Sequence, residues 1–273
     1  MSRISERSRA PAPSVLIAIL LMLITLPMGC GTATRKTGEQ SRASEAAETS
    51  KAVQPLLPAW RKIDRVALVS SLGWGQISQG STALRRVALT FDAGSGGANT
   101  PAILDDLKAA GLHCTFFVTG QFANANPAIM SRIAADGHEI GNHSYSHPKF
   151  TTLSAPEVSS QLARTEAAVK ASTRLSTKPY FRSPYGLGSD ALIRQINAEG
   201  YLCVLWTIDT LDWDPATSTE AIRSRVMQRV GPGAIVLMHA DSPQEAQVLP
   251  AVISDLKAAA YEIVTLSEAL EAR

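Results

Sequence analysis

The chain has 273 residues, of which 45% are hydrophobic and 18% are charged, and its formal net charge is +2. This composition excludes a chain that is disordered throughout, and it supplies enough apolar residues for one sizeable core. The small net charge gives no indication of nucleic acid or of a strongly anionic partner.

Residues 1–30 have the pattern of an export signal. A basic start precedes the apolar run 15–26, which is too short to span a bilayer comfortably. Gly29 and Cys30 then resemble a bacterial lipoprotein processing site, in which the cysteine is lipidated, although Pro27 departs from the usual pattern. An ordinary signal peptide and an uncleaved anchor are the alternatives. All three predict an exported domain that faces outside the cytoplasm.

Residues 31–60 are rich in small and polar side chains and are expected to form a flexible linker. Residues 61–85 are expected to form a short lead-in segment that packs on the main domain, residues 86–273. Such a linker after a lipid or membrane anchor would tether the domain to the membrane, and we expect the domain to be a monomer.

From Val87 onward, short β-rich runs alternate with segments of helical periodicity, which predicts a parallel α/β sheet. An irregular barrel of seven or eight strands fits best, and an open doubly wound sheet is the alternative. The expected strands are 87–91, 115–118, 139–143, 180–182, 203–206, 235–238 and 262–265. The expected helix starts are Thr100-Pro101, Asn126-Pro127, Ser189, Pro250 and two capping boxes, Ser154 with Glu157 and Thr217 with Glu220.

Two cysteines, Cys114 and Cys203, lie in apolar, strand-like runs of this domain. Export permits a disulfide between them, and two separate core thiols are the alternative. The sequence cannot decide, because it does not show whether the two residues are close in space.

Histidines and a carboxylate stand where several expected strands end, which is where an α/β barrel carries its active site. Asp92 follows a buried run and is either a base, a metal ligand or an N-cap. His143 and His147 have a four-residue spacing suited to Zn²⁺ or a similar ion, with two surface histidines as the alternative. His239 ends another apolar run, where a lone histidine is more often a core residue than a catalyst.

Further polar and aromatic residues follow the remaining strands. Arg182 lies among aromatic residues and prolines and is expected to hold a carboxylate by a two-pronged hydrogen bond. Asp209 and Asp212 are either site carboxylates or loop caps, and Trp213 is either a core residue or a platform for a sugar. Taken together, the set suits a metal-assisted hydrolase.

Five fragments in this order resemble the motifs of polysaccharide deacetylases with a NodB-homology domain, carbohydrate esterase family 4. The resemblance covers roughly residue 86 to the C-terminus. It implies a deformed (β/α) barrel, a divalent metal that is commonly Zn and sometimes Co or Ni, and removal of acetyl groups from N-acetylglucosamine or O-acetyl xylose units. The fragments are Thr90-Phe91-Asp92-Ala93-Gly94, His143-Ser144-Tyr145-Ser146-His147, Arg182-Ser183-Pro184-Tyr185, Asp209-Thr210-Leu211-Asp212-Trp213 and Leu237-Met238-His239.

The resemblance also implies how protons are moved. Asp92 would be the general base, oriented by Arg182. His239 would be the general acid, held and tuned by Asp212. An amide leaves poorly unless its nitrogen is protonated, so one group must take a proton and another must give one.

The remaining implied roles concern the metal and the substrate. His143 and His147 would hold the ion. The backbone N–H of Tyr185 would help to bind the oxyanion, and Leu237 and Trp213 would wall the acetyl pocket.

One position departs from the family pattern. The first motif ordinarily reads Thr-Phe-Asp-Asp-Gly and its second aspartate is the third metal ligand, whereas this chain has Ala93. A substitute such as Asp92, a loop oxygen or water could complete a weaker site, the metal could bind only with substrate, or the domain could have lost catalysis and kept sugar binding. Because the base and the acid are both present, we expect an active, membrane-tethered N-deacetylase of peptidoglycan or chitin oligomers. A non-catalytic glycan-binding lipoprotein and an O-acetyl xylan esterase are the alternatives.

Overall fold

The computed structural model describes residues 57–94 and 96–271. The expected leader and most of the expected linker lie outside these residues, so export, lipidation of Cys30 and tethering stay predictions. None of the helices in the described part of the chain has the length and apolar content needed to span a bilayer.

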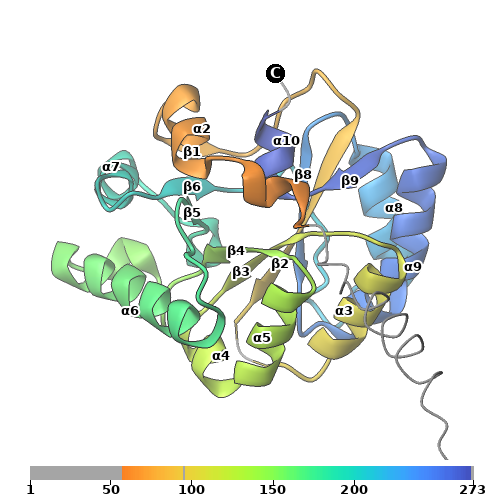
Figure 1. The fold of residues 1–273 in the computed structure, drawn as a ribbon. Coiled ribbons are helices and arrows are strands. Elements are labelled where there is room, and N and C mark those ends of the chain that lie inside the picture. Colours follow the sequence, from red (N-terminus) through yellow and green to blue (C-terminus); the bar gives the residue numbers. More distant parts are fainter. Residues whose placement is uncertain (1–56, 95, 272–273) are drawn as a thin grey trace, which may run out of the picture. The chain divides into compact units, whose positions relative to one another are not determined.

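A curved parallel sheet of short strands forms the centre of the domain (Figure 1). The strands are β1 (Gln76–Ile77), β2 (Arg86–Ala93), β3 (Thr115–Val118), β4 (Glu139–Asn142), β5 (Tyr180–Phe181), β6 (Leu202–Val204), β7 (Ile208–Asp209), β8 (Ala234–His239) and β9 (Glu262–Val264). Their order is β1-β6-β5-β4-β3-β2-β8-β7, with β9 also paired to β2, and all these pairings are parallel. No pairing joins β1 to β7 among the described residues, so the barrel is open between them. The expected deformed (β/α) barrel is confirmed.

All seven expected strands are present, and the structure adds β1 and β7, two residues each. The apolar run around each of these strands is too short for the sequence to distinguish the strand from a loop. β1 comes from the lead-in segment and pairs with β6. β7 begins only four residues after β6 and pairs with β8. Tertiary pairing, rather than local sequence, makes these two segments strands.

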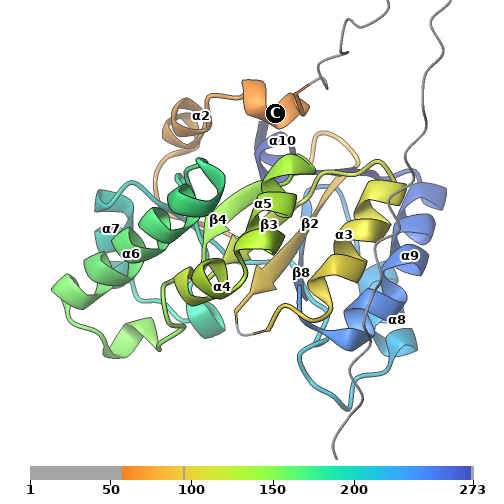
Figure 2. The ribbon, with the colours of Figure 1, turned by 60° about the horizontal axis from the view of Figure 1, so that its bottom comes forward.

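Helices cover the outside of the sheet, and neighbours in contact follow the order α7, α6, α5, α3, α9 and α8 (Figure 2). The apolar faces of α3, α5, α8, α9 and the last turns of α6 meet the outward-pointing residues of β2, β3 and β8 in one large core, whereas α7 and the start of α6 pack in a smaller cluster. These helices are α3 (Thr100–Ala109), α5 (Pro127–Ala135), α6 (Ala155–Thr173), α7 (Asp190–Ala198), α8 (Thr219–Arg229) and α9 (Pro243–Ala258), and a short α4 (Gly120–Ala125) packs on α6.

The capping residues expected for α6 and α7 are confirmed. Ser154 and Glu157 form the expected capping box, and the Ser189 side chain accepts a hydrogen bond from the N–H of Leu192. The expected box of Thr217 with Glu220 is wrong. The N-cap of α8 is Ser218, one residue later, and this places Glu220 at the second helical position, where it cannot close a box.

The expected start of the last long helix at Pro250 is also wrong. α9 begins at Pro243 behind the N-cap Ser242, whose side chain accepts from the N–H of Glu245, and Pro250 lies inside the helix. Val248 and Val252, on either side of this proline, are buried in the main core. Burial of this apolar face outweighs the hydrogen bond that the proline removes.

The opposite end of the barrel, at the amino ends of the strands, is covered by η1 (Ala59–Lys62), α2 (Arg65–Leu72) and α10 (Leu266–Glu271). Trp60, which falls at the end of the expected linker, is 5% exposed, and its indole N–H donates to the Gly137 carbonyl at 2.7 Å. Cys114 and Cys203 are buried free thiols in separate apolar clusters. The structure therefore supports two core thiols rather than a disulfide.

Candidate active site

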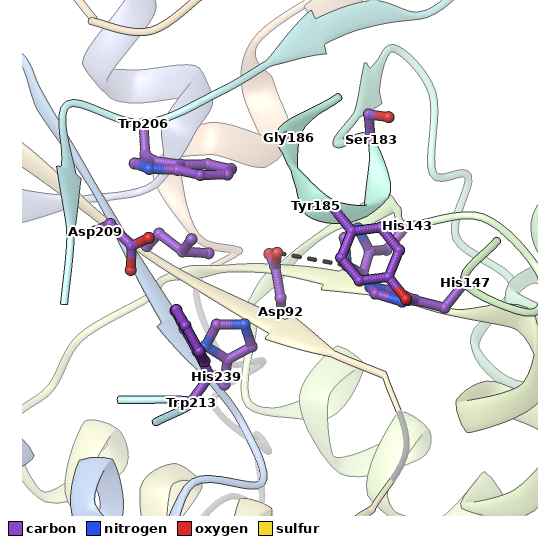
Figure 3. Close-up of a pocket in the computed structure, with 11 residues that line it drawn as sticks. Asp92, His143, His147, Ser183, Tyr185, Gly186, Trp206, Asp209, Trp213 and His239 are labelled. Atoms are coloured by element: carbon purple, nitrogen blue, oxygen red, sulfur yellow. Dashed lines mark ion pairs between the residues drawn. The ribbon is translucent and has the colours of Figure 1, made fainter. Parts of the chain in front are cut away.

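A cavity of about 430 Å³ opens at the carboxyl ends of the strands (Figure 3). The parallel arrangement brings residues from the ends of six strands to this end of the barrel, because all the strands point the same way. Arg182 and Asp212 lie directly behind it, bonded to cavity residues. The expected site residues that line the cavity are Asp92, His143, His147, Tyr185, Asp209, Trp213, Leu237 and His239.

Asp92 lies near the end of β2, opposite His239 of β8, and is 4% exposed. Its Oδ1 accepts a 2.7 Å hydrogen bond from Nη1 of the fully buried Arg182. Burial by itself would raise the pKa of Asp92, but the charge of Arg182, followed by His143 and His239, outweighs it and holds that pKa below its usual value. The carboxylate is thus ionised and ready to accept a proton.

The expected two-pronged hydrogen bond of Arg182 is wrong. Only Nη1 reaches the carboxylate, while Nε donates to the carbonyl of Val204 at 3.3 Å and Nη2 to that of Leu205 at 3.2 Å. The guanidinium also lies 4.1 Å from the ring centroid of Phe117. Two backbone carbonyls of the neighbouring chain segment compete for the donors, so Arg182 is fixed on several sides and holds Asp92 by one bond.

The His143 and His147 rings lie together, with centroids 4.9 Å apart. His143 Nδ1 is 2.9 Å from the carbonyl of Arg182, which can only accept, so Nδ1 carries the proton and Nε2 keeps a lone pair. That Nε2 is 3.5 Å from Oδ2 of Asp92. Burial lowers the pKa of His143 to about 4 and also lowers the pKa of His147. Both imidazoles are therefore neutral near pH 7, the form that binds metals.

Asp212 shifts the pKa of His239 in the opposite direction. Its Nδ1 lies 2.8 Å from Oδ1 of Asp212, and its backbone N–H donates to Oδ2 at 2.7 Å. Burial would lower the pKa of His239, but the hydrogen bond and the charge of Asp212 outweigh it and raise that pKa. The ring therefore favours its protonated form, as a general acid requires.

We expect Asp212→Asn to lower the pKa of His239, because the variant loses the hydrogen bond and the charge that raise it most, whereas burial, which lowers it, remains. In the native protein, the raised pKa contributes stability that is fully present below the unfolded-state pKa. This stability is lost as pH rises through the folded-state pKa. This loss should be smaller in the variant. NMR titration of the His239 ring measures the shift, and an unchanged pKa would contradict the assignment of Asp212.

Several loop residues around the site have left-handed backbone conformations that are uncommon for residues other than glycine. Ser144, His147, Tyr185 and Leu211 have φ values between 58° and 69°. Such conformations persist where the surrounding structure over-determines them, and they cluster at functional sites. The N–H of Tyr185 has no hydrogen-bond partner among the described residues, which leaves it available to an oxyanion.

Aromatic side chains form the walls of the cavity. Trp213 and Tyr185 are 58% and 59% exposed at its rim, so Trp213 is not a core residue, and Leu237 is buried. Trp206, for which the sequence suggested a core position, lines the cavity as a further wall. A Cβ at Gly186 would lie 2.8 Å from the Trp206 ring. Glycine at this position therefore allows the Trp206 ring to occupy its place in the cavity wall. Trp206 lies in an apolar, strand-like run of the sequence, and such a run does not distinguish a cavity residue from a core residue.

An adjoining cavity of about 510 Å³ shares Asp92 and the three site histidines. It adds Gln121 at the start of α4, Ser146 and Asp241. Neither Gln121 nor Asp241 is among the residues expected at the site from the sequence. Asp241 could have been noticed as a carboxylate two residues after His239, whereas nothing in the sequence marks Gln121. The two cavities together form one cleft, and Asp92 and the three site histidines line both of its halves.

The site lacks a complete set of metal ligands. A catalytic zinc ion usually has three protein ligands and one open position, and the two imidazoles supply two. Ala93 is fully buried in the apolar cluster behind β2 and lines neither cavity. Across residues 57–94 and 96–271, no group of three His, Cys, Asp or Glu side chains could hold a metal ion. The residues present therefore do not fit a three-ligand ion.

The sequence of this chain is similar to those of known polysaccharide deacetylases. The sequence model of the family Polysaccharide deacetylase matches residues 79–204. The chain is 32% identical over 191 residues to the Bacillus subtilis peptidoglycan-N-acetylmuramic acid deacetylase PdaA, covering 69% of this chain and 73% of that protein. It is 33% identical over 227 residues to the Listeria monocytogenes peptidoglycan-N-acetylglucosamine deacetylase PgdA, covering 82% of this chain but only 47% of that protein.

Solved structures include active and inactive relatives. A wild-type CE4 family pseudoenzyme from Bacillus anthracis matches with a TM-score of 0.71 and 31% identity over 75% of this chain and 72% of that one. A mutant of that pseudoenzyme with restored enzymatic activity matches with a TM-score of 0.71 and 32% identity over 75% of this chain and 74% of that one. The B. subtilis PdaA structure matches with a TM-score of 0.68 and 31% identity over 74% of this chain and 87% of that one.

Proposed function

Since this chain belongs to the polysaccharide deacetylase family, we propose that it hydrolyses N-acetyl groups of N-acetylglucosamine-type glycans. One observation carries the proposal: Asp92 and His239 line the same cavity, and their buried partners shift their pKa values in opposite directions. The lowered pKa keeps the Asp92 carboxylate ionised and able to accept a proton, and the raised pKa favours the protonated form of His239, which can donate one.

The reaction follows from these assignments. Asp92 accepts a proton from a water whose oxygen attacks the acetyl carbonyl carbon, and the N–H of Tyr185 stabilises the negative charge on the carbonyl oxygen. His239 then donates a proton to the amide nitrogen as the carbon–nitrogen bond breaks. Acetic acid, which ionises to acetate, and an amino sugar leave; Asp92 then releases its proton to solvent, and His239 takes one up from solvent. Arg182 and Asp212 keep the base and the acid in position.

Dependence on a divalent ion is part of the proposal. Two neutral imidazoles suit Zn²⁺, with Co²⁺ or Ni²⁺ as alternatives. His143 and His147 alone should hold any of these weakly, because Ala93 provides no oxygen. Activity is therefore expected to require added ion and to disappear with a chelator.

The proposed substrate is the envelope polysaccharide of the cell, with peptidoglycan first. This rests on the expected export signal and lipid anchor, which would place the domain outside the cytoplasm and tethered to a membrane. Two relatives are named as peptidoglycan deacetylases. The expected monomer is likewise part of the proposal.

Acetate release from peptidoglycan, chitin oligomers and acetylated xylan tests the function. We expect Asp92→Asn to reduce the rate about 10²- to 10⁴-fold, because a neutral amide cannot act as the base. The exposed Asp190→Asn is the control and should keep the native rate. An unchanged rate in Asp92→Asn would refute the assigned base, and release only from xylan would favour the O-acetyl esterase.

A second candidate function is glycan binding without turnover. The apolar position of Ala93 and the likeness to a CE4 family pseudoenzyme favour it. It predicts that oligosaccharides bind while no acetate appears at any ion concentration. The same substrate panel, measured with binding alongside acetate release, separates the two functions.

A further inference from the structure

Residues 143–147 form an irregular loop after β4, and this loop carries both histidines of the expected pair. Two of its residues have left-handed backbone conformations, with φ of 69° at Ser144 and 58° at His147. Such conformations persist only where the surrounding structure over-determines them. The loop therefore depends on contacts from outside itself to keep its shape.

Two helices supply these contacts. The N–H of Gly120, the first residue of α4, donates to the carbonyl of Ser144 at 3.0 Å. The next N–H, that of Gln121, donates to the carbonyl of Tyr145 at 3.0 Å. From α6, the side chain of Gln161 reaches N–H groups of the same loop. One helix thus holds the loop through its carbonyls and the other through its N–H groups.

Gln161 makes three hydrogen bonds to this loop with one side-chain amide. Its Oε1 accepts from the N–H of Tyr145 at 2.7 Å and from the N–H of Ser146 at 3.0 Å, and its Nε2 donates to Oγ of Ser146 at 3.0 Å. These two N–H groups belong to neither a helix nor a strand, so the amide takes the place of a backbone partner. Gln161 is not among the described residues that line the cleft, so it acts on the site through the loop.

The two histidines depend on this loop to different degrees. His143 stands at its start, where its N–H donates to the carbonyl of Val118 in the neighbouring strand β3 at 3.0 Å. His147 stands at its end, where its N–H donates to Oγ of Ser144, within the loop, at 3.0 Å. The centroid of the His147 ring lies 4.8 Å from that of Tyr185 (Figure 3). A shift of the loop would therefore move His147 against Tyr185, while the sheet keeps His143 in place.

We infer that Gln161 is a positioning residue for this site, which holds the loop so that His147 stays against Tyr185 and Ser146 stays in the wall of the cleft. The effect on the rate rests on the proposed function, in which the N–H of Tyr185 stabilises the carbonyl oxygen. A misplacement of about 1 Å in an active site can lower a rate about 10²-fold. Hydrogen bonds that prevent such a movement therefore affect the rate although Gln161 does not touch the substrate.

Gln161→Met tests the inference, because methionine has a similar length and helix propensity but lacks the amide. Amide hydrogen exchange of Tyr145 and Ser146, followed by NMR, should become about tenfold faster, since each N–H loses its hydrogen bond. The kcat for acetate release from chitin oligomers should fall about 10- to 100-fold. KM should change less, because Trp206 and Trp213, which wall the cleft, belong to other segments.

Gln161→Glu and Gln195→Met are the matched controls. Glutamate keeps an oxygen that accepts from both N–H groups, and the Ser146 hydroxyl can donate to it, so slow exchange and most of kcat should return. Gln195 of α7 also bonds to the backbone, since its Nε2 donates to the carbonyl of Ala155 at 2.7 Å, and its replacement should leave the loop and kcat unchanged. If Gln161→Met does not fold, Gln161→Asn withdraws the amide by one methylene and should give the same losses.

Three results would overturn the inference: native exchange at Tyr145 and Ser146 in Gln161→Met, an equal loss of kcat in Gln195→Met, or no recovery in Gln161→Glu. Faster exchange with a native kcat would support the activity while refuting the positioning role. The exchange measurement requires no turnover. Faster exchange in a protein that releases no acetate even before substitution would support the hold of Gln161 on the loop while refuting the proposed activity. The two failures are therefore distinguishable.

Discussion

Ala93→Asp is expected to give a protein whose stability and activity both depend on a divalent ion. Ala93 is fully buried in an apolar cluster next to Asp92. Without metal, a new carboxylate there should cost about 2–4 kcal/mol of unfolding free energy, because it is buried without a partner. With Zn²⁺ at about 100 times its dissociation constant, ion binding should return about 2.7 kcal/mol.

Acetate release by this variant should rise at least about 10²-fold over the native protein when zinc is present, because a completed Lewis-acid site contributes several kcal/mol to catalysis. Unfolding in urea with and without Zn²⁺, zinc content and acetate release provide the measurements. Ala93→Asn is the matched control, since it adds similar bulk with no charge. If zinc stabilises both variants equally, or neither, the third-ligand interpretation of this position fails.

Arg182→Met is expected to be the most destabilising single change at the site. It leaves the buried carboxylate of Asp92 without its counter-charge, and loss of one partner of a buried ion pair costs about 3–5 kcal/mol. The pKa of Asp92 should rise, because burial would then face less opposing charge. Urea unfolding near neutral pH measures the loss.

The double variant Arg182→Met with Asp92→Asn provides the control for this prediction. If the pair interaction accounts for the loss, removing the carboxylate as well should recover a substantial part of the stability. Additive losses in the double variant would show instead that the contacts of Arg182 with Phe117 and the carbonyls of Val204 and Leu205 stabilise the fold.

Much of the fold was predictable because its signals are local. The sequences around Phe91, Phe117 and Val236 are short, continuous apolar runs, which are typical of strands buried on both faces. They match β2, β3 and β8. Ser154 and Ser189 mark helix starts because their hydroxyls satisfy backbone N–H groups within three residues. Local patterns did not predict the helix bounds where tertiary packing determines them. One example is α9, which continues through Pro250.

The candidate site divides in the same way. The sequence by itself determined that Asp92 and His239 reach the barrel mouth, since a polar residue after a buried strand can lie only at its carboxyl end. It also determined the absence of a carboxylate at Ala93.

Only the tertiary structure decided how these groups are paired and tuned. Arg182 and Asp92 are 90 residues apart in the sequence, so only the fold brings them together. Arg182 binds Asp92 through one nitrogen, because two backbone carbonyls of a neighbouring segment accept hydrogen bonds from its other donors. Asp241 and Trp206 enter the cleft because their chain segments are brought there by strands distant in the sequence. Burial, hydrogen-bond competition and charge distance depend on three-dimensional neighbours, and these set the protonation states on which the proposed chemistry rests.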